Sequence, residues 1–317
     1  LDAIAYLWKE IGTSCIHLPQ THRIVQLMRT VLDAVAPDVM LVTESNVPHR
    51  DNISYFGDGS DEAQLVYNFA LPPLVLHSLV SGNAKALTRW AGTLKLPTTK
   101  VTFLNFLASH DGIGVTPVRG ILSDAEADQL VALAEARGGF VSRKSNQDGG
   151  TTPYELNINY FDALFAGSGA ESEQVAIDRF LTAHAIMLAM PGLPAIYLHS
   201  LFGSRGDRAL AESSGIPRRI NRQRLALSDL ERELDDPGSR RSRVFNGLSQ
   251  LLRQRQASPA FQPTARAEVL ALDPRVFALR RTSTDGKREA FCLHNVSAET
   301  LNVSGETLGP YQSRWLL

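Results

Sequence analysis

Two kinds of hydrophobic pattern alternate along the first four fifths of the chain. Apolar residues three and four positions apart predict helices at residues 22–36, 72–94 (interrupted near 81–83), 123–137, 177–190 and 242–256. Short unbroken apolar runs predict buried strands at residues 39–42, 65–69, 101–107 and 194–198. Polar, Gly-rich segments at 49–61 and 138–152 are predicted to be loops. Alternating strands and helices are typical of a parallel sheet with helical crossovers.

The pattern changes after about residue 263. Short segments with strand character follow one another at residues 269–272, 276–281, 290–294, 301–303 and 314–317. Asp285-Gly286, between two of these segments, is typical of a hairpin turn. We therefore expect an α/β domain at residues 1–262, followed by a small antiparallel β domain at 263–317.

Composition bounds the class of protein. The chain has 317 residues, 44% of them hydrophobic, which is enough for a large core. Its 32 Lys and Arg and 33 Asp and Glu leave a net charge of -1, so we do not expect a nucleic acid as a partner. No apolar run reaches about 18 residues, so no membrane helix is expected. Two cysteines, Cys15 and Cys292, are too few for a disulfide framework, and a cytoplasmic location is the simpler interpretation.

Three acidic residues occupy similar places relative to predicted strands. Glu44 follows the strand at 39–42, Asp111 follows the strand at 101–107, and Asp2 fits the end of a strand before it. In a parallel α/β barrel the carboxyl ends of the strands meet at one face, where catalytic groups gather. Converging carboxylates suit either a metal site with oxygen ligands or glycoside cleavage through a cationic sugar. Taken singly, each is also typical of a helix N-cap or a loop.

Short segments along the chain carry a more specific signal. They are Leu1-Asp2-Ala3 with Tyr6 and Lys9, then Thr43-Glu44, then Ser109-His110-Asp111, supported by residues 8–15, 154–157, 191–197 and 220–222. In this order and rough spacing they resemble the signature regions of the α-amylase superfamily, glycoside hydrolase family 13. The closer resemblance is to the sucrose phosphorylase subfamily, and it covers nearly the whole chain.

The resemblance implies a fold and three catalytic roles. The fold is the C-terminal part of a (β/α)8 TIM barrel, from the end of its fourth strand, followed by a small antiparallel β domain. Asp2 would be the nucleophile at the end of the fourth strand. Glu44 would be the acid/base at the end of the fifth strand, and Asp111 the transition-state stabiliser at the end of the seventh.

The resemblance also implies substrate-binding residues. His110 would contact sugar hydroxyls, and Arg222 would hold the glucose. Tyr154 aligns with a tyrosine that contacts phosphate, although a half-buried aromatic residue at the start of a helix is an equally good interpretation. Glu155 stands where sucrose phosphorylases carry a glutamine. Neither a metal site nor an organic cofactor is implied.

The implied reaction is retaining phosphorolysis of an α-glucoside, with inorganic phosphate as acceptor and α-glucose 1-phosphate as product. The two reacting carboxyl groups would lie about 5–5.5 Å apart. Residues 43–49, 52–57 and 61–63 resemble the branch that acts on glucosylglycerate or glucosylglycerol. We favour glucosylglycerate because Arg143-Lys144, just before Tyr154, could bind its carboxylate. Solvated surface charges are the more common case for such a pair.

Other functions stay open. A hydrolase, a transglucosidase or a sucrose phosphorylase of the same superfamily would share the three carboxylates and differ in its acceptor or its aglycone. A catalytically inactive barrel that serves as a binding subunit is a hypothesis of another class. Intact Asp2, Glu44 and Asp111 argue against it. The oligomeric state is not indicated by the sequence.

The chain lacks segments that the resembling family carries before the nucleophile, including the first three barrel strands and an inserted domain. We therefore interpret it as the C-terminal part of a longer enzyme. Half a barrel exposes an unpaired apolar strand edge, so we expect the isolated chain to be inactive and prone to aggregation. Size-exclusion chromatography and an activity assay test this, and a soluble monomer that turns over substrate would contradict it.

Overall fold

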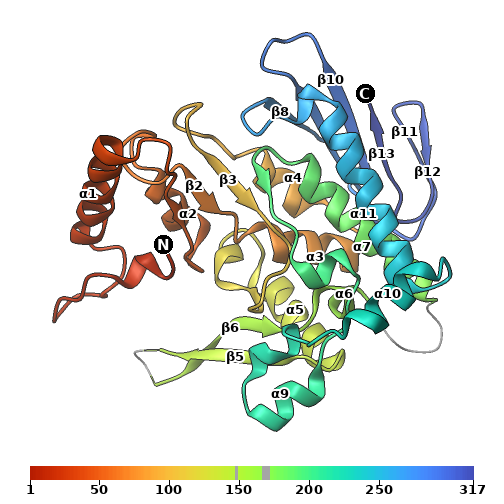
Figure 1. Cartoon of the computed structure of the whole chain (residues 1–317), viewed down its shortest axis with the longest axis horizontal. Coiled ribbons are helices and arrows are strands. Elements are labelled where there is room, and N and C mark those ends of the chain that lie inside the picture. Colours follow the sequence, from red (N-terminus) through yellow and green to blue (C-terminus); the bar gives the residue numbers. More distant parts are fainter. Residues whose placement is uncertain (147–148, 166–171) are drawn as a thin grey trace.

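A computed structural model describes residues 1–146, 149–165 and 172–317. Its central sheet consists of parallel strands, in the order β1 (Val42–Thr43), β2 (Leu65–Tyr67), β3 (Thr102–Asn105) and β7 (Leu193–Pro194). Residues 1–3 extend this sheet, because Asp2 pairs in parallel with Glu44 just beyond β1. The predicted parallel α/β arrangement is confirmed, with strands shorter than the apolar runs indicated (Figure 1).

Helices connect and cover these strands (Figure 1). They are α1 (Pro19–Val35), α2 (His49–Asn52), α3 (Leu71–Ser81), α4 (Lys85–Ala91), α5 (Asp124–Ala136), α6 (Tyr160–Leu164), α7 (Glu173–Ala189), α8 (Leu198–Leu201), α9 (Arg208–Ser214), α10 (Leu227–Asp235) and α11 (Arg240–Ala257). The five predicted helices correspond to α1, to α3 with α4, and to α5, α7 and α11. The predicted break falls between α3 and α4, where Gly82 takes a left-handed conformation with φ 66°.

Three local predictions are wrong. Residues 49–61, predicted as a loop, begin with α2 and the 3₁₀ helix Ile53–Phe56. Residues 138–152, predicted as a loop, contain β5 (Phe140–Ser145) and the start of β6 (Thr151–Asn157), which form an antiparallel sheet with β4 (Ile113–Gly114). Of the residues that suggested a loop, Gly138 and Gly139 precede β5, Ser142 and Ser145 belong to β5, and Asn146, Gly149 and Gly150 lie between the two strands. The strand predicted at 194–198 leaves the sheet early. Its last bond to β3 is from the Ala195 N–H to the Asn105 carbonyl, and α8 follows.

The C-terminal segment is antiparallel, as predicted. Its main sheet has the order β13 (Ser313–Leu316), β10 (Glu289–Asn295), β9 (Val276–Thr282) and β8 (Arg266–Leu270). A separate pair joins β11 (Leu301–Val303) to β12 (Glu306–Leu308), of which β12 was not predicted. The chain turns between β9 and β10 at Asp285-Gly286, where Gly286 has φ 71°. The domain boundary between residues 262 and 263 stays a prediction.

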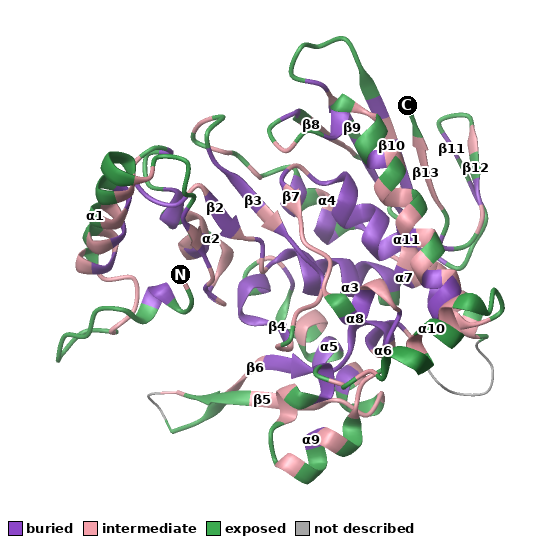
Figure 2. Cartoon of the chain, in the orientation of Figure 1, coloured by how far each residue is buried: buried purple, intermediate pink, exposed green. Residues whose placement is uncertain are grey.

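One large core joins the two parts of the molecule. Buried side chains of α3 and α7, such as Leu74 and Phe180, belong to the same apolar cluster as Phe277 of β9 and Cys292 of β10. Figure 2 shows this continuous buried region across α3, α4 and α7. The C-terminal sheet therefore packs against the helices that cover the central sheet, and it stabilises their positions.

The apolar stripe of α1 lies partly on an exposed face. Val25 and Arg29 point inward and are almost fully buried, whereas Leu27, Val31 and Val35 have exposed fractions of 61%, 50% and 73%. Figure 2 shows α1 at the edge of the molecule with much of its surface exposed. An apolar stripe on a helix usually faces a packing partner, so this face has the character of a contact surface.

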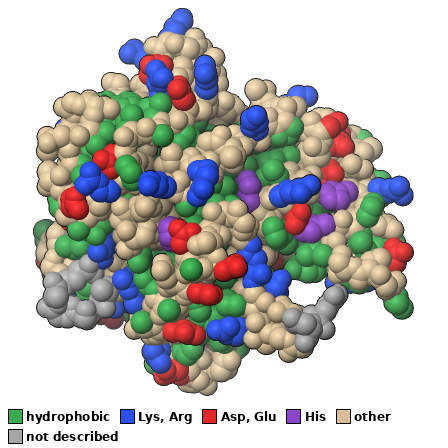
Figure 3. All heavy atoms as spheres, turned by 180° about the vertical axis from the view of Figure 1, so that it is seen from behind, with side chains coloured by type: hydrophobic (Ala, Val, Ile, Leu, Met, Phe, Trp, Pro, Cys, Tyr) green, Lys and Arg blue, Asp and Glu red, His purple; other side chains and the backbone are tan. Residues whose placement is uncertain are grey.

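Charged side chains of both signs are interspersed on the face seen in Figure 3. This distribution agrees with the net charge of -1. Within the described ranges, none of the helices combines the length and the apolar character that a bilayer crossing requires.

A buried arginine connects the C-terminal sheet to the rest of the molecule. Arg281 of β9 is fully buried, and its guanidinium donates to the carbonyls of Ala189 at 2.7 Å and Gln262 at 2.9 Å. Burial lowers the pKa of Arg281 to about 10. Arg280, its neighbour in β9, is 44% exposed and pairs with Glu268.

We predict that Arg281→Met destabilises the protein by about 3 kcal/mol, because buried carbonyls lose their donors. The matched control Arg280→Met should cost less than about 1 kcal/mol, because its ion pair is exposed. Urea-induced unfolding of the two variants, each made in the full-length protein that contains this chain, measures the difference. Equal losses would show that Arg281 does not connect the two parts.

Candidate active site

Asp2 and Glu44 lie at matching positions on neighbouring parallel segments. The Ala3 N–H donates to the Glu44 carbonyl and the Glu44 N–H donates to the Leu1 carbonyl, each over 2.9 Å. Residues paired in this way project from the same face of a sheet, and adjacent strands lie about 4.8 Å apart. This spacing fits the separation of about 5–5.5 Å between the two carboxyl groups of retaining glycosidases.

Asp111 follows β3 by six residues and is held by charged groups at both carboxylate oxygens. Arg222 Nη2 donates to its Oδ1 at 3.0 Å, and Arg218 Nη1 lies 3.0 Å from its Oδ2. The Asn221 side chain donates to the Asp111 carbonyl at 2.7 Å. The side chain of Asp111 is 27% exposed, so this carboxylate is oriented by the protein but open to a ligand.

The three carboxylates interact electrostatically at Glu44. Burial, then the negative charges of Asp2 and Asp111, raise the pKa of Glu44, while His110 acts in the opposite direction. Glu44 therefore keeps its proton to a higher pH than an ordinary glutamate. A carboxyl group with this property suits the role of general acid.

His110 and Arg222 lie beside Asp111, His110 as its neighbour in the sequence and Arg222 through the fold. The side chain of His110 is 60% exposed, and its Nε2 lies 3.5 Å from Asp111 Oδ1. Arg222 Nε donates to the His110 carbonyl at 3.0 Å. Both side chains are exposed on the same side of the molecule as Asp111, where a sugar could reach them.

Tyr154 and Glu155 lie side by side in β6 but in different surroundings. Glu155 is only 2% exposed, and its carboxylate accepts from the Gly112 N–H at 2.8 Å and from Arg218. Tyr154 is half-buried and hydrogen-bonds with Asn46, close to Arg218. Burial, followed by the neighbouring Tyr6 and Glu155, raises the pKa of the Tyr154 hydroxyl. Tyr154 is therefore available as a neutral hydrogen-bonding group.

Arg218 is a residue that the sequence does not reveal as part of the site. It lies in the 3₁₀ turn Pro217–Asn221, four residues before Arg222. A signal was present in the repeated arginines at 218, 219 and 222. Nothing local distinguishes Arg218, which contacts two carboxylates, from its exposed neighbour Arg219.

Arg143 and Lys144 lie on β5 rather than in a loop. Their side chains are exposed, and Arg143 is opposite Pro153 in the register with β6. Among the described residues, neither forms an ion pair with Asp2, Glu44 or Asp111. Their role toward a substrate carboxylate stays a prediction.

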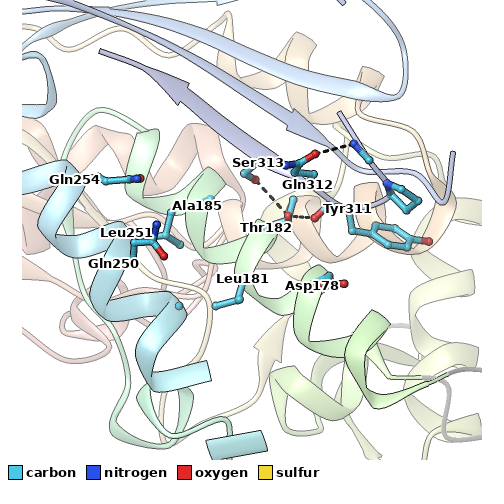
Figure 4. Close-up of a pocket in the computed structure, with 13 residues that line it drawn as sticks. Asp178, Leu181, Thr182, Ala185, Gln250, Leu251, Gln254, Tyr311, Gln312 and Ser313 are labelled. Atoms are coloured by element: carbon cyan, nitrogen blue, oxygen red, sulfur yellow. Dashed lines mark hydrogen bonds between the residues drawn. The ribbon is translucent and has the colours of Figure 1, made fainter. Parts of the chain in front are cut away.

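A pocket of about 430 Å³ lies elsewhere, between α7, α11 and the segment before β13 (Figure 4). Thr182 donates there to the Tyr311 carbonyl at 2.5 Å, and Ser313 donates to Thr182. No candidate active-site residue lines this pocket. In the described part of the chain, no group of three or more His, Cys, Asp and Glu side chains is placed to hold a metal ion.

The fold matches part of an α-amylase-type (β/α)8 barrel with its C-terminal β domain. Sucrose 6F-phosphate phosphorylase from Thermoanaerobacter thermosaccharolyticum superposes on 100% of this chain with a TM-score of 0.78 and 21% sequence identity. The match covers 60% of that structure. No family model matches the chain.

Comparison with curated sequences finds relatives of higher identity, and their names are more specific than the fold. A glucosylglycerate phosphorylase from Allomeiothermus silvanus is 49% identical over 100% of this chain and 59% of its own length. A glucosylglycerate phosphorylase from Escherichia coli is 46% identical over 90% of this chain and 51% of its own length. The resemblance to the sucrose phosphorylase group is confirmed by these relatives. The chain spans about half to three fifths of the length of the curated relatives it matches.

The electrostatic link between Asp111 and Glu44 can be measured directly. We predict that Asp111→Asn lowers the pKa of Glu44, because it removes one of the charges that disfavour the ionised form. Since the raised pKa means that ionising Glu44 with rising pH costs folding free energy, the substitution should also reduce that cost.

Carboxyl-carbon NMR titration of the full-length protein that contains this chain tests this prediction, with the Glu44 signal assigned by its loss in Glu44→Gln. Asp178→Asn, in the pocket of Figure 4, is the matched control and should leave the Glu44 titration unchanged. An unchanged or higher pKa in Asp111→Asn would contradict the link.

Proposed function

We propose that the full-length protein containing this chain is a retaining glycoside phosphorylase, with glucosylglycerate as the favoured α-glucoside. The observation that carries this proposal is the parallel register that sets Asp2 beside Glu44, with the charge of Asp111 acting on Glu44. The names of the relatives that are 49% and 46% identical support the substrate class.

The first step forms a covalent glucosyl-enzyme. The ionised carboxylate of Asp2 attacks the anomeric carbon of the α-glucoside, and the bond from that carbon to the aglycone oxygen breaks. Glu44 donates its proton to the leaving oxygen, which its raised pKa favours. Asp111 stabilises the positive charge that develops on the sugar, because an oriented carboxylate needs little reorganisation at that moment.

The second step transfers the glucosyl group to phosphate. A phosphate oxygen attacks the anomeric carbon, the ester bond to Asp2 breaks, and the ionised Glu44 accepts the proton of the attacking phosphate group if it carries one. The product is α-glucose 1-phosphate, with the configuration retained after two inversions. In this proposal Tyr154 hydrogen-bonds to phosphate, and His110 and Arg222 hydrogen-bond to sugar hydroxyls.

Other predictions belong to the same proposal. The two cysteines are free thiols, Cys292 buried and Cys15 half-buried, which fits the predicted cytoplasmic location. Arg143 and Lys144 stay candidates for the glycerate carboxylate, because β5 pairs with the strand that carries Tyr154. The proposed reaction needs no organic cofactor.

Synthesis from α-glucose 1-phosphate tests the proposed function. The full-length protein is incubated with this donor and with glycerate, glycerol, fructose or fructose 6-phosphate in separate reactions, and phosphate release is followed. We expect release to depend strongly on glycerate, and to be abolished by Glu44→Gln, which cannot exchange a proton with the oxygen at the anomeric carbon.

The other outcomes would each change the conclusion. Release that is insensitive to the acceptor would indicate a hydrolase. Dependence on glycerol, fructose or fructose 6-phosphate would keep phosphorolysis and replace the aglycone. No release by the folded protein would favour a binding subunit, and would contradict the roles of Asp2 and Glu44.

A further inference from the structure

A chain of ionic contacts runs from the interior to Asp111. Glu155 of β6 is buried, and its two oxygens accept from Arg218 Nε at 3.0 Å and from Arg218 Nη2 at 2.5 Å. The remaining terminal nitrogen of the same guanidinium, Nη1, lies 3.0 Å from Asp111 Oδ2. Arg218 therefore bridges a buried carboxylate and a carboxylate that faces the site.

The inner end of this chain is rigidly placed. Glu155 pairs with Gly114 in the register between β6 and β4, and the Gly112 N–H donates to its carboxylate. A Cβ atom at residue 112 would come within 2.7 Å of Glu155 Oε1 and 2.5 Å of the Leu156 carbonyl, so only glycine fits this approach. Asp111 is thus tied to Glu155 twice, through the backbone N–H of Gly112 and, at its own carboxylate, through Arg218.

The formal charges of the four side chains around Asp111 sum to zero. Glu155 and Asp111 contribute two negative charges, and Arg218 and Arg222 contribute two positive charges. Partial burial disfavours the charged form of Arg218, but hydrogen bonds and charges from Glu155, with a further contribution from Asp111, outweigh it and raise the pKa of Arg218. Arg218 stays cationic, and its guanidinium interacts with the carboxylates of both Glu155 and Asp111.

We propose that Arg218 is a positioning residue for Asp111 and that Glu155 holds it in place. This inference rests on the proposed function, in which Asp111 stabilises the cationic sugar. Two guanidinium groups, one at each oxygen, hold the Asp111 carboxylate in one orientation. Because Arg218 also pairs with Glu155, its positive charge does not fully compensate Asp111. Asp111 therefore keeps negative charge that can stabilise the sugar cation.

This proposal differs from the role that the resemblance implies for Glu155. A carboxylate that is 2% exposed and already accepts from three N–H groups has little capacity left for a substrate hydroxyl. Its contribution reaches the substrate through Arg218 and Asp111.

The test uses α-glucosyl fluoride beside the natural glucoside, both with phosphate, in the full-length protein. Fluoride leaves the sugar without a proton, so Glu44→Gln should retain cleavage of the fluoride while losing the glucoside. Arg218→Ala should lower kcat about 100-fold on both substrates, because a misplaced Asp111 impairs charge stabilisation with either leaving group. KM should stay within about threefold of its original value.

Chemical rescue and three further variants separate positioning from a general structural role. Added guanidinium ion should restore part of the kcat of Arg218→Ala and none of the kcat of Glu44→Gln. Arg218→Lys, which keeps the charge but loses the planar fork, should fall between wild type and Arg218→Ala. Glu155→Gln should lower kcat about tenfold or more with little effect on KM. Arg219→Ala, at the exposed neighbouring arginine, is the matched control and should match wild type.

Several results would overturn the proposal. One is a kcat for Arg218→Ala within about threefold of the Arg219→Ala control. A second is a change in Arg218→Ala that raises KM and leaves kcat unchanged. A third is a decrease in the kcat of Arg218→Ala that added guanidinium does not reverse. If thermal unfolding shows that Arg218→Ala does not fold, Arg218→Lys and Glu155→Gln test the proposal in its place. An unchanged kcat in both variants would contradict the positioning role of Arg218. An inactive wild-type protein would instead be a failure of the proposed function, which the acceptor assay detects separately.

Discussion

Main-chain hydrogen bonds between residues 1–3 and the end of β1 hold Asp2 beside Glu44, and the chemistry of the site depends on this parallel register. A slip of one residue would turn one of the two carboxylates to the opposite face of the sheet. The register is supported from within, because Ala5 and Thr43 are fully buried next to the pair. Further along the sheet, buried Asn68 donates to the Asn105 side chain at 2.9 Å and links β2 to β3.

Charge compensation is the second constraint on the site. A buried carboxylate such as Glu155 is costly unless it is paired and hydrogen-bonded. Arg218 and the Gly112 N–H meet that requirement, and the same contacts orient the loop that carries Asp111. Glu44 has no such cationic partner among the described side chains, and burial beside two other carboxylates raises its pKa. Two glutamates near one site thus have different surroundings, since Glu155 is paired with a guanidinium and Glu44 lies beside other carboxylates.

The C-terminal sheet supports the site from a distance. Its buried face shares one apolar cluster with α3 and α7, and Arg281 donates to carbonyls outside that sheet. Arg255 of α11 makes a similar contact, donating to the Gly192 carbonyl at 3.0 Å directly before β7. Gly192 is itself close-packed, since a Cβ there would lie 2.5 Å from the Phe103 carbonyl of β3. These contacts hold β7 and β3 in place at one side of the central sheet.

The local hydrophobic pattern was sufficient to predict the helices whose apolar residues recur at a regular spacing, such as α5, α7 and α11. It was also sufficient to predict β9 and β10 with their Asp285-Gly286 turn. The order of short motifs was sufficient to select Asp2, Glu44 and Asp111 as candidates, and the structure shows Glu44 and Asp111 after strands of the parallel sheet and Asp2 paired with Glu44. Local pattern was insufficient for β5 and β6, because the glycine pairs that precede the two strands, Gly138-Gly139 and Gly149-Gly150, are typical of loops.

Contacts between distant residues lie beyond any local pattern. Glu155 and Arg218 are 63 positions apart, and Arg218 and Arg219 are chemically identical neighbours. Only the path of the backbone through the turn Pro217–Asn221 brings one of them to Asp111 and leaves the other exposed. The pKa of Glu44 depends in the same way on burial and on charges from separate strands. The sequence therefore determines which groups are present and where each strand and helix forms, whereas folding in three dimensions determines which charges meet and how water is excluded from them.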